Sequence, residues 1–272
     1  MPKACINGIN LYYETWGDPN SPPLLLIGGL SAYTRSWDKL LPTLSQNFRV
    51  IVFDNRGVGK SDKPPPPYSM DEFAADTLGL LDHLGIKVVD VFGVSMGGMI
   101  AQHLALKYPK RVRCLVLGCT SCDGPAILRR PEAAKLLKPL PPQTQERKKA
   151  LRERLRYLLS PAFLKAYPEE FERLVLEALG ANQPTHGYLG QLDAVWGHNT
   201  CARLSELYIP TLVMHGTADI IVPLENGLFL AQQIPEARFI TFEGAGHLFY
   251  VEQVYKMKII ITEFLIGDQG IK

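Results

Sequence analysis

The chain has 272 residues, of which 46% are hydrophobic and 21% are charged, and its formal net charge is +2. This length can bury one large core with a modest insertion, and the composition is that of an ordinary globular protein. The small net charge gives no reason to expect a nucleic acid or an acidic membrane surface as a partner. No apolar run reaches the roughly 18 residues of a membrane-spanning helix, and the N-terminus lacks the layout of a signal peptide. We therefore expect a cytoplasmic protein.

The first part of the chain alternates strand and helix patterns. Asn7-Gly8 predicts a tight hairpin turn before a strand over residues 9–16. Mainly apolar runs, typical of parallel strands buried on both faces, occupy residues 24–27, 50–53, 88–92 and 112–117. Apolar residues at helical spacing occupy residues 37–44, 70–84 and the segment after 95. Between them, the proline run 64–67 predicts an exposed connector. Such alternation indicates βα units around a mostly parallel sheet.

The alternation stops between residues 123 and 207, where helical segments are broken by prolines. Residues 129–156 hold ten Lys or Arg against three Glu. We interpret this excess as a solvated helix face, with a patch for an anionic ligand or a partner as the alternative. Strand patterns return at residues 211–215 and 238–242, with helices over 224–234 and 251–265. We predict that residues 1–122 and 208–272 form the core and that 123–207 form an inserted helical cap, or lid.

The five cysteines are an odd, scattered set. Cys119 and Cys122 have the C-x-x-C spacing of some redox and metal sites. No second pair follows at zinc spacing, so we expect all five thiols to be structural and reduced. No other metal-ligand spacing occurs, and we expect neither a metal nor a cofactor.

The sequence G-V-S-M-G at residues 93–97 lies between a predicted strand and a predicted helix. This is the pattern of the nucleophile elbow, G-x-S-x-G. A turn this sharp strains the backbone at Ser95, so Gly93 and Gly97 must leave room beside it. The Ser95 hydroxyl then stands beside the first amides of a helix, where negative charge is favoured. We predict that Ser95 is a catalytic nucleophile.

A serine nucleophile needs a histidine base and a carboxylate that orients the histidine. Among the six histidines, we select His247, which follows a predicted strand in a glycine-rich loop. We select Asp219, just after the strand that ends at His215, as the acid; His215 itself we assign to packing. The order Ser95, Asp219, His247 is the chain order that accompanies the elbow. Asp123 is the rival for the acid.

Backbone amides must also hold the oxyanion that forms during acyl transfer. We predict that these amides belong to Met96, directly after the nucleophile, and to Leu30, after the Gly28-Gly29 turn. Apolar residues beside the motifs indicate an uncharged acyl group of modest size. The predicted substrate-binding residues are Gly29, Ile221, Val222 and Leu248.

With these motifs, the sequence resembles the α/β-hydrolase superfamily, and within it the esterase, enol-lactonase and cofactor-free haloperoxidase-like branch. The stretches that carry the resemblance are residues 27–29, 54–62, 93–98, 191–200, 209–219 and 244–247. The resemblance implies a mostly parallel eight-stranded sheet with helices on both faces and a helical cap insertion. Members of the family usually carry His-Gly where this chain has Gly28-Gly29. The Leu30 amide does not depend on that side chain, but we expect a more flexible loop there.

Together, the residues and the resemblance predict a serine hydrolase that cleaves small-molecule carboxylic esters or lactones. Ser95 argues against the dehalogenase relatives, which carry Asp at that position. Val94 argues against carbon–carbon bond hydrolases, in which Asn often precedes the serine. Perhydrolysis, with peroxide in place of water, and a small-molecule receptor with little turnover remain the alternatives. The sequence carries no signal for the oligomeric state.

Overall fold

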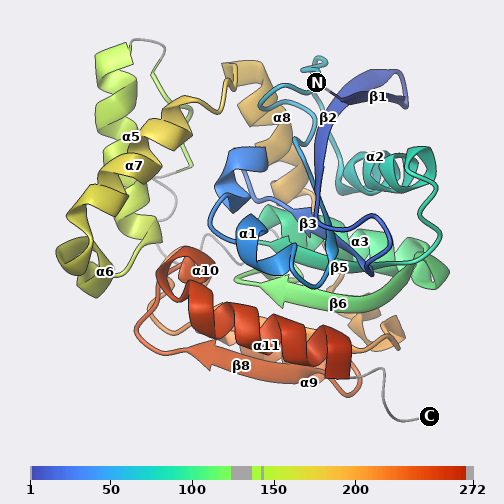
Figure 1. Cartoon of the computed structure of the whole chain (residues 1–272). Helices are drawn as coiled ribbons and strands as arrows, with labels where there is room; N and C mark the ends of the chain where they lie inside the picture. The colour runs from blue at the N-terminus through green and yellow to red at the C-terminus, as the bar shows by residue number, and fades with distance from the viewer. Residues whose placement is uncertain (1, 124–136, 142–143, 268–272) are drawn as a thin grey trace.

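The structure is a computed structural model of the chain and describes residues 2–123, 137–141 and 144–267. Its centre is an eight-stranded sheet with the order β1-β2-β4-β3-β5-β6-β7-β8 (Figure 1). The strands are β1 (Lys3–Ile6), β2 (Ile9–Trp16), β3 (Pro23–Ile27), β4 (Arg49–Phe53), β5 (Val89–Val94), β6 (Val112–Gly118), β7 (Thr211–Gly216) and β8 (Arg238–Phe242). Only the β1–β2 and β2–β4 pairs among these strands are antiparallel. The predicted mostly parallel eight-stranded sheet is confirmed.

Helices cover both faces of the sheet. On one face, α2 (Met70–His83), α3 (Met96–Lys107) and α9 (Leu224–Gln233) pack in the core cluster that contains Leu25 and Ile27. On the other face, α1 (Leu41–Leu44) and α11 (Val254–Gly267) pack in the cluster that contains Leu24 and Leu26. Neighbouring residues of β3 thus point to opposite faces, and both faces are buried, which explains its continuous apolar run. No described helix is long and apolar enough to cross a membrane.

Two predicted helices are divided in the structure. In place of one helix over 37–44, a 3₁₀ helix η1 (Thr34–Trp37) precedes the short helix α1. Pro42 lies in the first turn of α1, where its missing N–H costs no helical hydrogen bond, so a new helix begins there. In place of one helix over 251–265, α10 (Phe249–Glu252) ends at Gln253 before α11 begins. The apolar spacing therefore identified the buried face of these segments but not their continuity.

Four α-helices of the described residues lie between β6 and β7, and we call them the inserted helices: α5 (Thr144–Leu158), α6 (Pro161–Ala166), α7 (Pro168–Leu179) and α8 (Thr185–Trp196). In Figure 1, α5, α6 and α7 stand together at the left, the side toward which the arrowheads of β6 and β8 point. Two further 3₁₀ helices, η2 (Pro109–Arg111) and η4 (Cys201–Glu206), lie before β6 and β7. Helices α5, α6 and α7 thus stand beyond the carboxyl ends of these strands.

The expectation of five reduced thiols is wrong. Cys122 and Cys201, which are 79 residues apart in the sequence, form a disulfide. Cys119 is a buried free thiol, so the C-x-x-C pair is not bonded. Beside the disulfide, Asp123 and Asn199 form an isolated β-bridge. These links join the two chain segments that lead into and out of the inserted helices.

Candidate active site

The turn between β5 and α3 holds Ser95 in a strained backbone conformation. Its φ is 55° and its ψ is −122°, a region that L-residues rarely adopt. The Ser95 N–H donates to the Gly118 carbonyl of β6 at 2.9 Å. The Thr120 hydroxyl donates to the Ser95 carbonyl at 2.8 Å. The end of the neighbouring strand therefore fixes the strained residue from both sides.

The glycines of the elbow are required by close contacts of the backbone. A Cβ on Gly97 would lie 2.0 Å from the Ile27 carbonyl oxygen, and one on Gly93 would lie 2.3 Å from the Gly97 carbonyl oxygen. These distances are far below van der Waals contact. Helix α3 can therefore approach β3 and β5 only with glycine at both positions.

Asp219 and His247 meet beyond the ends of β7 and β8. The Nδ1 atom of His247 lies 2.7 Å from Oδ2 of Asp219. The other carboxylate oxygen accepts the N–H groups of Ile221 at 2.8 Å and Val222 at 3.0 Å. Both side chains are almost fully buried, with residue exposures of 3% for Asp219 and 5% for His247. Asp123, the rival acid, lies instead in the bridge to Asn199.

The environment of Asp219 favours its ionised form. Burial by itself would raise the pKa of this carboxyl, but the charge of His247 and the hydrogen bonds of His215 and His247 outweigh burial and hold the pKa well below its usual range. A carboxylate only accepts hydrogen bonds, so the hydrogen-bond network assigns the His247 proton to Nδ1. In the neutral imidazole with this tautomer, Nε2 carries no proton and can act as a general base.

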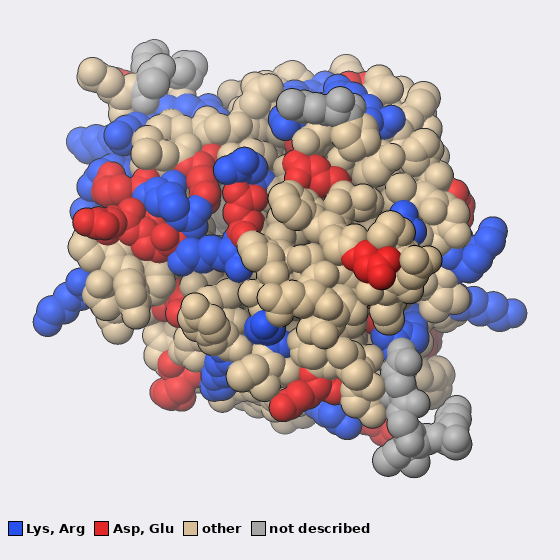
Figure 2. Space-filling model, viewed as in Figure 1, with Lys and Arg blue, Asp and Glu red and all other residues tan. Residues whose placement is uncertain are grey.

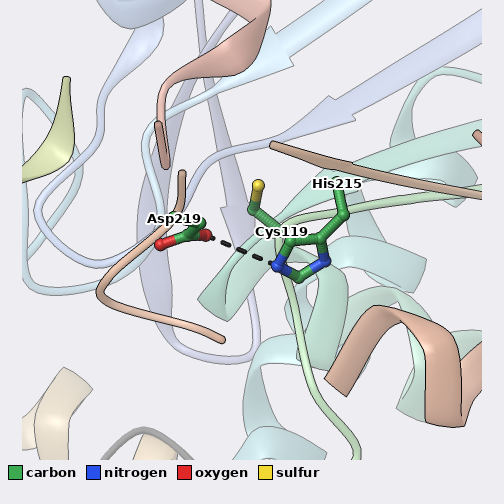
Figure 3. A group of neighbouring side chains, drawn as sticks. All are labelled: Cys119, His215 and Asp219. Atoms are coloured by element: carbon green, nitrogen blue, oxygen red, sulfur yellow. Dashed lines mark ion pairs between the residues drawn. The ribbon is translucent and has the colours of Figure 1, made fainter. Parts of the chain in front are cut away.

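His215 and Cys119 lie beside Asp219, with their polar atoms within 4.8 Å of one another (Figure 3). Nε2 of His215 lies 2.9 Å from the Val222 carbonyl oxygen and 3.5 Å from Oδ2 of Asp219. Burial, and secondarily the charge of Asp219, raises the pKa of the Cys119 thiol well above its usual value. A metal ion bound by these three residues would need that thiol deprotonated and would displace the existing hydrogen bonds. We therefore infer that His215 and Cys119 help to hold the Asp219 carboxylate in place. The sequence analysis, which assigned His215 to packing, did not predict this role.

A cavity of about 210 Å³ is lined by both Ser95 and His247. Gly29, Ile221 and Leu248, which were predicted to bind substrate, also line it. Val222 does not: its side chain is fully buried, and its backbone serves Asp219 and His215 instead. No hydrogen bond joins the Ser95 and His247 side chains in the described structure; without substrate such bonds are often long.

The amides of Leu30 and Met96 are available to a ligand. Both residues line the cavity, and no described carbonyl accepts a hydrogen bond from either N–H. A Cβ on Gly29 would lie 3.2 Å from the Ser95 Cβ and 3.7 Å from its Oγ. Glycine at position 29 therefore keeps open the space between the serine and the Leu30 amide.

Two glutamines hold the loop after β3, a role that the sequence analysis did not predict. The Ser31 N–H donates to Oε1 of Gln191 at 3.0 Å, and its hydroxyl contacts Oε1 of Gln183. Nε2 of Gln191 also donates to the Arg56 carbonyl at 2.9 Å. These bonds argue against the extra flexibility expected from Gly28. A Cβ on Gly28 would lie 2.9 Å from the Ala32 Cβ, so the loop is packed around the glycine.

The comparison with known families agrees with this geometry. Residues 22–254 match the family model described as the alpha/beta hydrolase fold. The chain belongs to the α/β-hydrolase family. This α/β-hydrolase falls in the esterase and enol-lactonase branch, as the sequence predicted. The match, together with the relatives below, shows a hydrolase.

Relatives match this α/β-hydrolase over nearly its whole length. It is 29% identical over 247 residues to 3-oxoadipate enol-lactonase 2 of Acinetobacter baylyi, covering 90% of this chain and 89% of that protein. It is 30% identical to a poly(3-hydroxyalkanoate) depolymerase of Ectopseudomonas oleovorans, with coverages of 92% and 86%. The crystal structure of the enol-lactonase from Burkholderia xenovorans LB400 superposes with a TM-score of 0.86 at 26% identity, covering 97% of this chain and all of that one.

Proposed function

We propose that this α/β-hydrolase cleaves carboxylic esters or lactones with small to medium, largely apolar acyl groups. The observation that carries the proposal is the convergence of three groups on one cavity: the strained Ser95, the buried His247–Asp219 pair and two free amides. Relatives named as an enol-lactonase and a poly(3-hydroxyalkanoate) depolymerase support the ester class. The predominantly apolar lining supports an apolar acyl group.

The proposed reaction proceeds in two acyl transfers. Ser95 Oγ attacks the carbonyl carbon while its proton passes to Nε2 of His247, and Asp219 stabilises the imidazolium. The Leu30 and Met96 amides hold the carbonyl oxygen as it becomes negative. The bond to the alkoxy oxygen breaks, and the alcohol takes the proton from His247. Water then attacks the acyl-enzyme, gives a proton to His247 and releases the acid, and that proton returns to Ser95.

A p-nitrophenyl ester series tests this function against a receptor function. We expect turnover of p-nitrophenyl butyrate with a burst of one p-nitrophenol per chain if deacylation is slow, and loss of activity in Ser95→Ala. Ser205→Ala, at an exposed serine, is the matched control and should be fully active. Tight ester binding with no turnover in the unmodified protein would instead support the receptor.

We further propose that residues 123–207 act as a lid on a core formed by 1–122 and 208–272. Support comes from α5, because Leu151, Leu155 and Leu158 line the cavity that holds Ser95. Ser160, which follows α5, donates its N–H to Glu252 at 2.9 Å, and Gly246 beside His247 donates to the same carboxylate at 2.9 Å. The lid and the His247 loop would therefore move together.

A cytoplasmic location remains a proposal, and the disulfide provides its test. Disulfides are rare in the reducing cytoplasm, whereas Cys122 and Cys201 are bonded in the structure. Alkylating thiols in intact cells before lysis, followed by peptide mass spectrometry, measures the state of both cysteines. Free thiols at both positions would support a cytoplasmic protein, and a fully bonded pair would contradict it.

A further inference from the structure

Two arginines of α5 line the otherwise mainly apolar cavity that contains Ser95 and His247. We propose that Arg147 and Arg154 bind a carboxylate at the distal end of the acyl group, so that the preferred substrates are monoesters or lactones of dicarboxylic acids. This inference rests on the proposed ester hydrolysis and names its substrate class. It replaces the expectation of a wholly uncharged acyl group.

Helix α5 sets the distance between the reaction centre and the two cations. Arg147, Leu151, Arg154, Leu155 and Leu158 lie at spacings that place them on one helix face, and all five line the cavity. The Leu158 carbonyl accepts the Leu248 N–H at 3.0 Å, which fixes this end of α5 next to His247. At 1.5 Å per residue, Arg154 lies about 6 Å and Arg147 about 16 Å farther along the axis. Leu158 and Leu155 therefore lie nearest the reaction centre, Arg154 comes next, and Leu151 lies between the two arginines.

Neither guanidinium is neutralised by a carboxylate of the described chain. Arg154 donates to the Lys138 carbonyl at 2.6 Å and lies over the Tyr188 ring at 5.3 Å. Among the described residues, Arg147 donates only to the Gln183 carbonyl, at 3.3 Å. A guanidinium has five N–H donors, so within the described part of the chain both side chains keep donors for a ligand. Burial first, and then the charge of Arg147, lowers the pKa of Arg154, a cost that a bound anion would relieve.

Other groups at the site are compatible with an anion. The Tyr188 hydroxyl is buried, and no described residue accepts a hydrogen bond from it, so it offers a further donor beside Arg154. Glu177, an acid that lines the cavity, forms an ion pair with Arg173 of α7. Its negative charge is thus already balanced from the outer side.

An ion pair of α5 distinguishes the face of this helix that lines the cavity from the opposite face. Arg152, on the side away from the cavity, forms an ion pair with Glu172 of α7. Figure 2 shows basic and acidic side chains interleaved at the left, where α5 and α7 lie in Figure 1. The solvated helix face expected for the basic segment therefore applies to the outer arginines. The inner pair corresponds to the alternative, an anionic-ligand site.

Hydrolysis of monomethyl adipate and dimethyl adipate, followed in a pH-stat, tests the proposal, because the two esters differ only in the distal carboxylate. We expect the unmodified protein to prefer the monoester in kcat/KM by roughly 10- to 100-fold, the range for one charge-assisted site. Arg154→Gln should abolish this preference, Arg147→Gln should reduce it, and Arg154→Lys should retain part of it. Arg156→Gln, an exposed arginine on the same helix, is the matched control and should keep the preference.

Equal hydrolysis of the two esters by the unmodified protein would overturn the proposal, as would an unchanged preference in folded Arg154→Gln. A binding measurement separates this outcome from failure of the hydrolase proposal. Calorimetric titration of the Ser95→Ala protein with adipate needs no catalysis, and Arg154→Gln in that background should weaken binding at least tenfold if the site exists. If neither ester is cleaved yet this binding difference is found, the hydrolysis proposal fails and the carboxylate site stands. Equal adipate binding by the Ser95→Ala protein with and without Arg154→Gln would contradict the carboxylate site, whether or not the esters are cleaved.

Discussion

At the scale of single residues, the proposed chemistry depends on the hydrogen bonds that hold the Asp219 carboxylate. Two backbone N–H groups donate to one oxygen of this carboxylate, and Nδ1 of His247 donates to the other oxygen. Asp219→Asn should keep the fold but favour the wrong histidine tautomer, reducing kcat for p-nitrophenyl butyrate by about 10⁴-fold. Asp193→Asn, at an exposed position, is the control. Full activity of Asp219→Asn together with loss in Asp123→Asn would reverse the assignment.

A histidine pair outside the site, in which His198 is buried and His103 is half-buried, makes stability depend on pH. Nε2 of His103 lies 3.2 Å from Nδ1 of His198, whose own Nε2 lies 3.1 Å from the Ser121 carbonyl oxygen. Burial, and next the neighbouring His103, lowers the pKa of His198 from 6.5 to about 3. Between pH 6.5 and about pH 3, His198 therefore binds a proton in the unfolded chain but not in the folded chain. The stabilisation is complete above pH 6.5 and is lost as the pH falls toward 3.

Urea unfolding between pH 7 and pH 4 measures this effect. We expect His198 to account for a loss of roughly 3 kcal/mol in the free energy of unfolding at pH 4. His198→Gln should flatten the acid limb of the stability profile. His186→Gln, at an exposed histidine, should leave it unchanged, and an identical acid limb in both variants would exclude His198 as its source.

The residues of the proposed triad could be predicted because each follows a strand in a motif of its own. Ser95 has a glycine elbow, and Asp219 and His247 follow the predicted strands 211–215 and 238–242. The supporting side chains have no such local pattern. Gln183 and Gln191 reach Ser31 from across the fold, and Cys119 meets Asp219 only because β6 and β7 are neighbours. Contacts made by sheet order and by the inserted helices cannot be read from spacing along the chain.

At the scale of secondary-structure elements, the close approach of α3 to β3 limits what the elbow tolerates. A Cβ on Gly97 would lie 2.0 Å from the Ile27 carbonyl oxygen. Gly97→Ala must push α3 away from β3 and should cost roughly 3 kcal/mol of stability, with loss of activity. Gly197→Ala is the matched control, since its Cβ would meet nothing closer than 3.5 Å. Thermal unfolding of both variants gives the comparison, and equal melting temperatures would contradict the packing argument.

The segments that flank the inserted helices are joined by a link that the sequence analysis did not foresee. Five scattered cysteines allow many pairings, and the 79 residues between Cys122 and Cys201 give no cue to their contact. The bond closes a long loop, so its loss should lower the free energy of unfolding by about 2–5 kcal/mol. Urea unfolding of the Cys122→Ser, Cys201→Ser double variant measures this, with Cys5→Ser, at an exposed free thiol, as the control. Equal stability of the double variant and the unmodified protein would contradict a stabilising disulfide.

At the scale of the whole molecule, an eight-stranded sheet brings residues far apart in the sequence to one end of the fold. The order of the strands and helices of the core was predictable from hydrophobic patterns, whereas the division into a core and a lid over residues 123–207 stays a prediction. The residues that line the cavity could not be predicted in this way, because α5 contributes both leucines and arginines to the lining. Its basic composition alone could not show which arginines face inward.

Covalent labelling with a fluorophosphonate tests the central claim, that Ser95 is the nucleophile activated by His247. Peptide mass spectrometry of the native protein after labelling should find one adduct, on Ser95. His247→Gln should slow the labelling strongly, and Ser95→Ala should prevent it. An adduct on another serine, or an equal labelling rate in His247→Gln, would contradict the account.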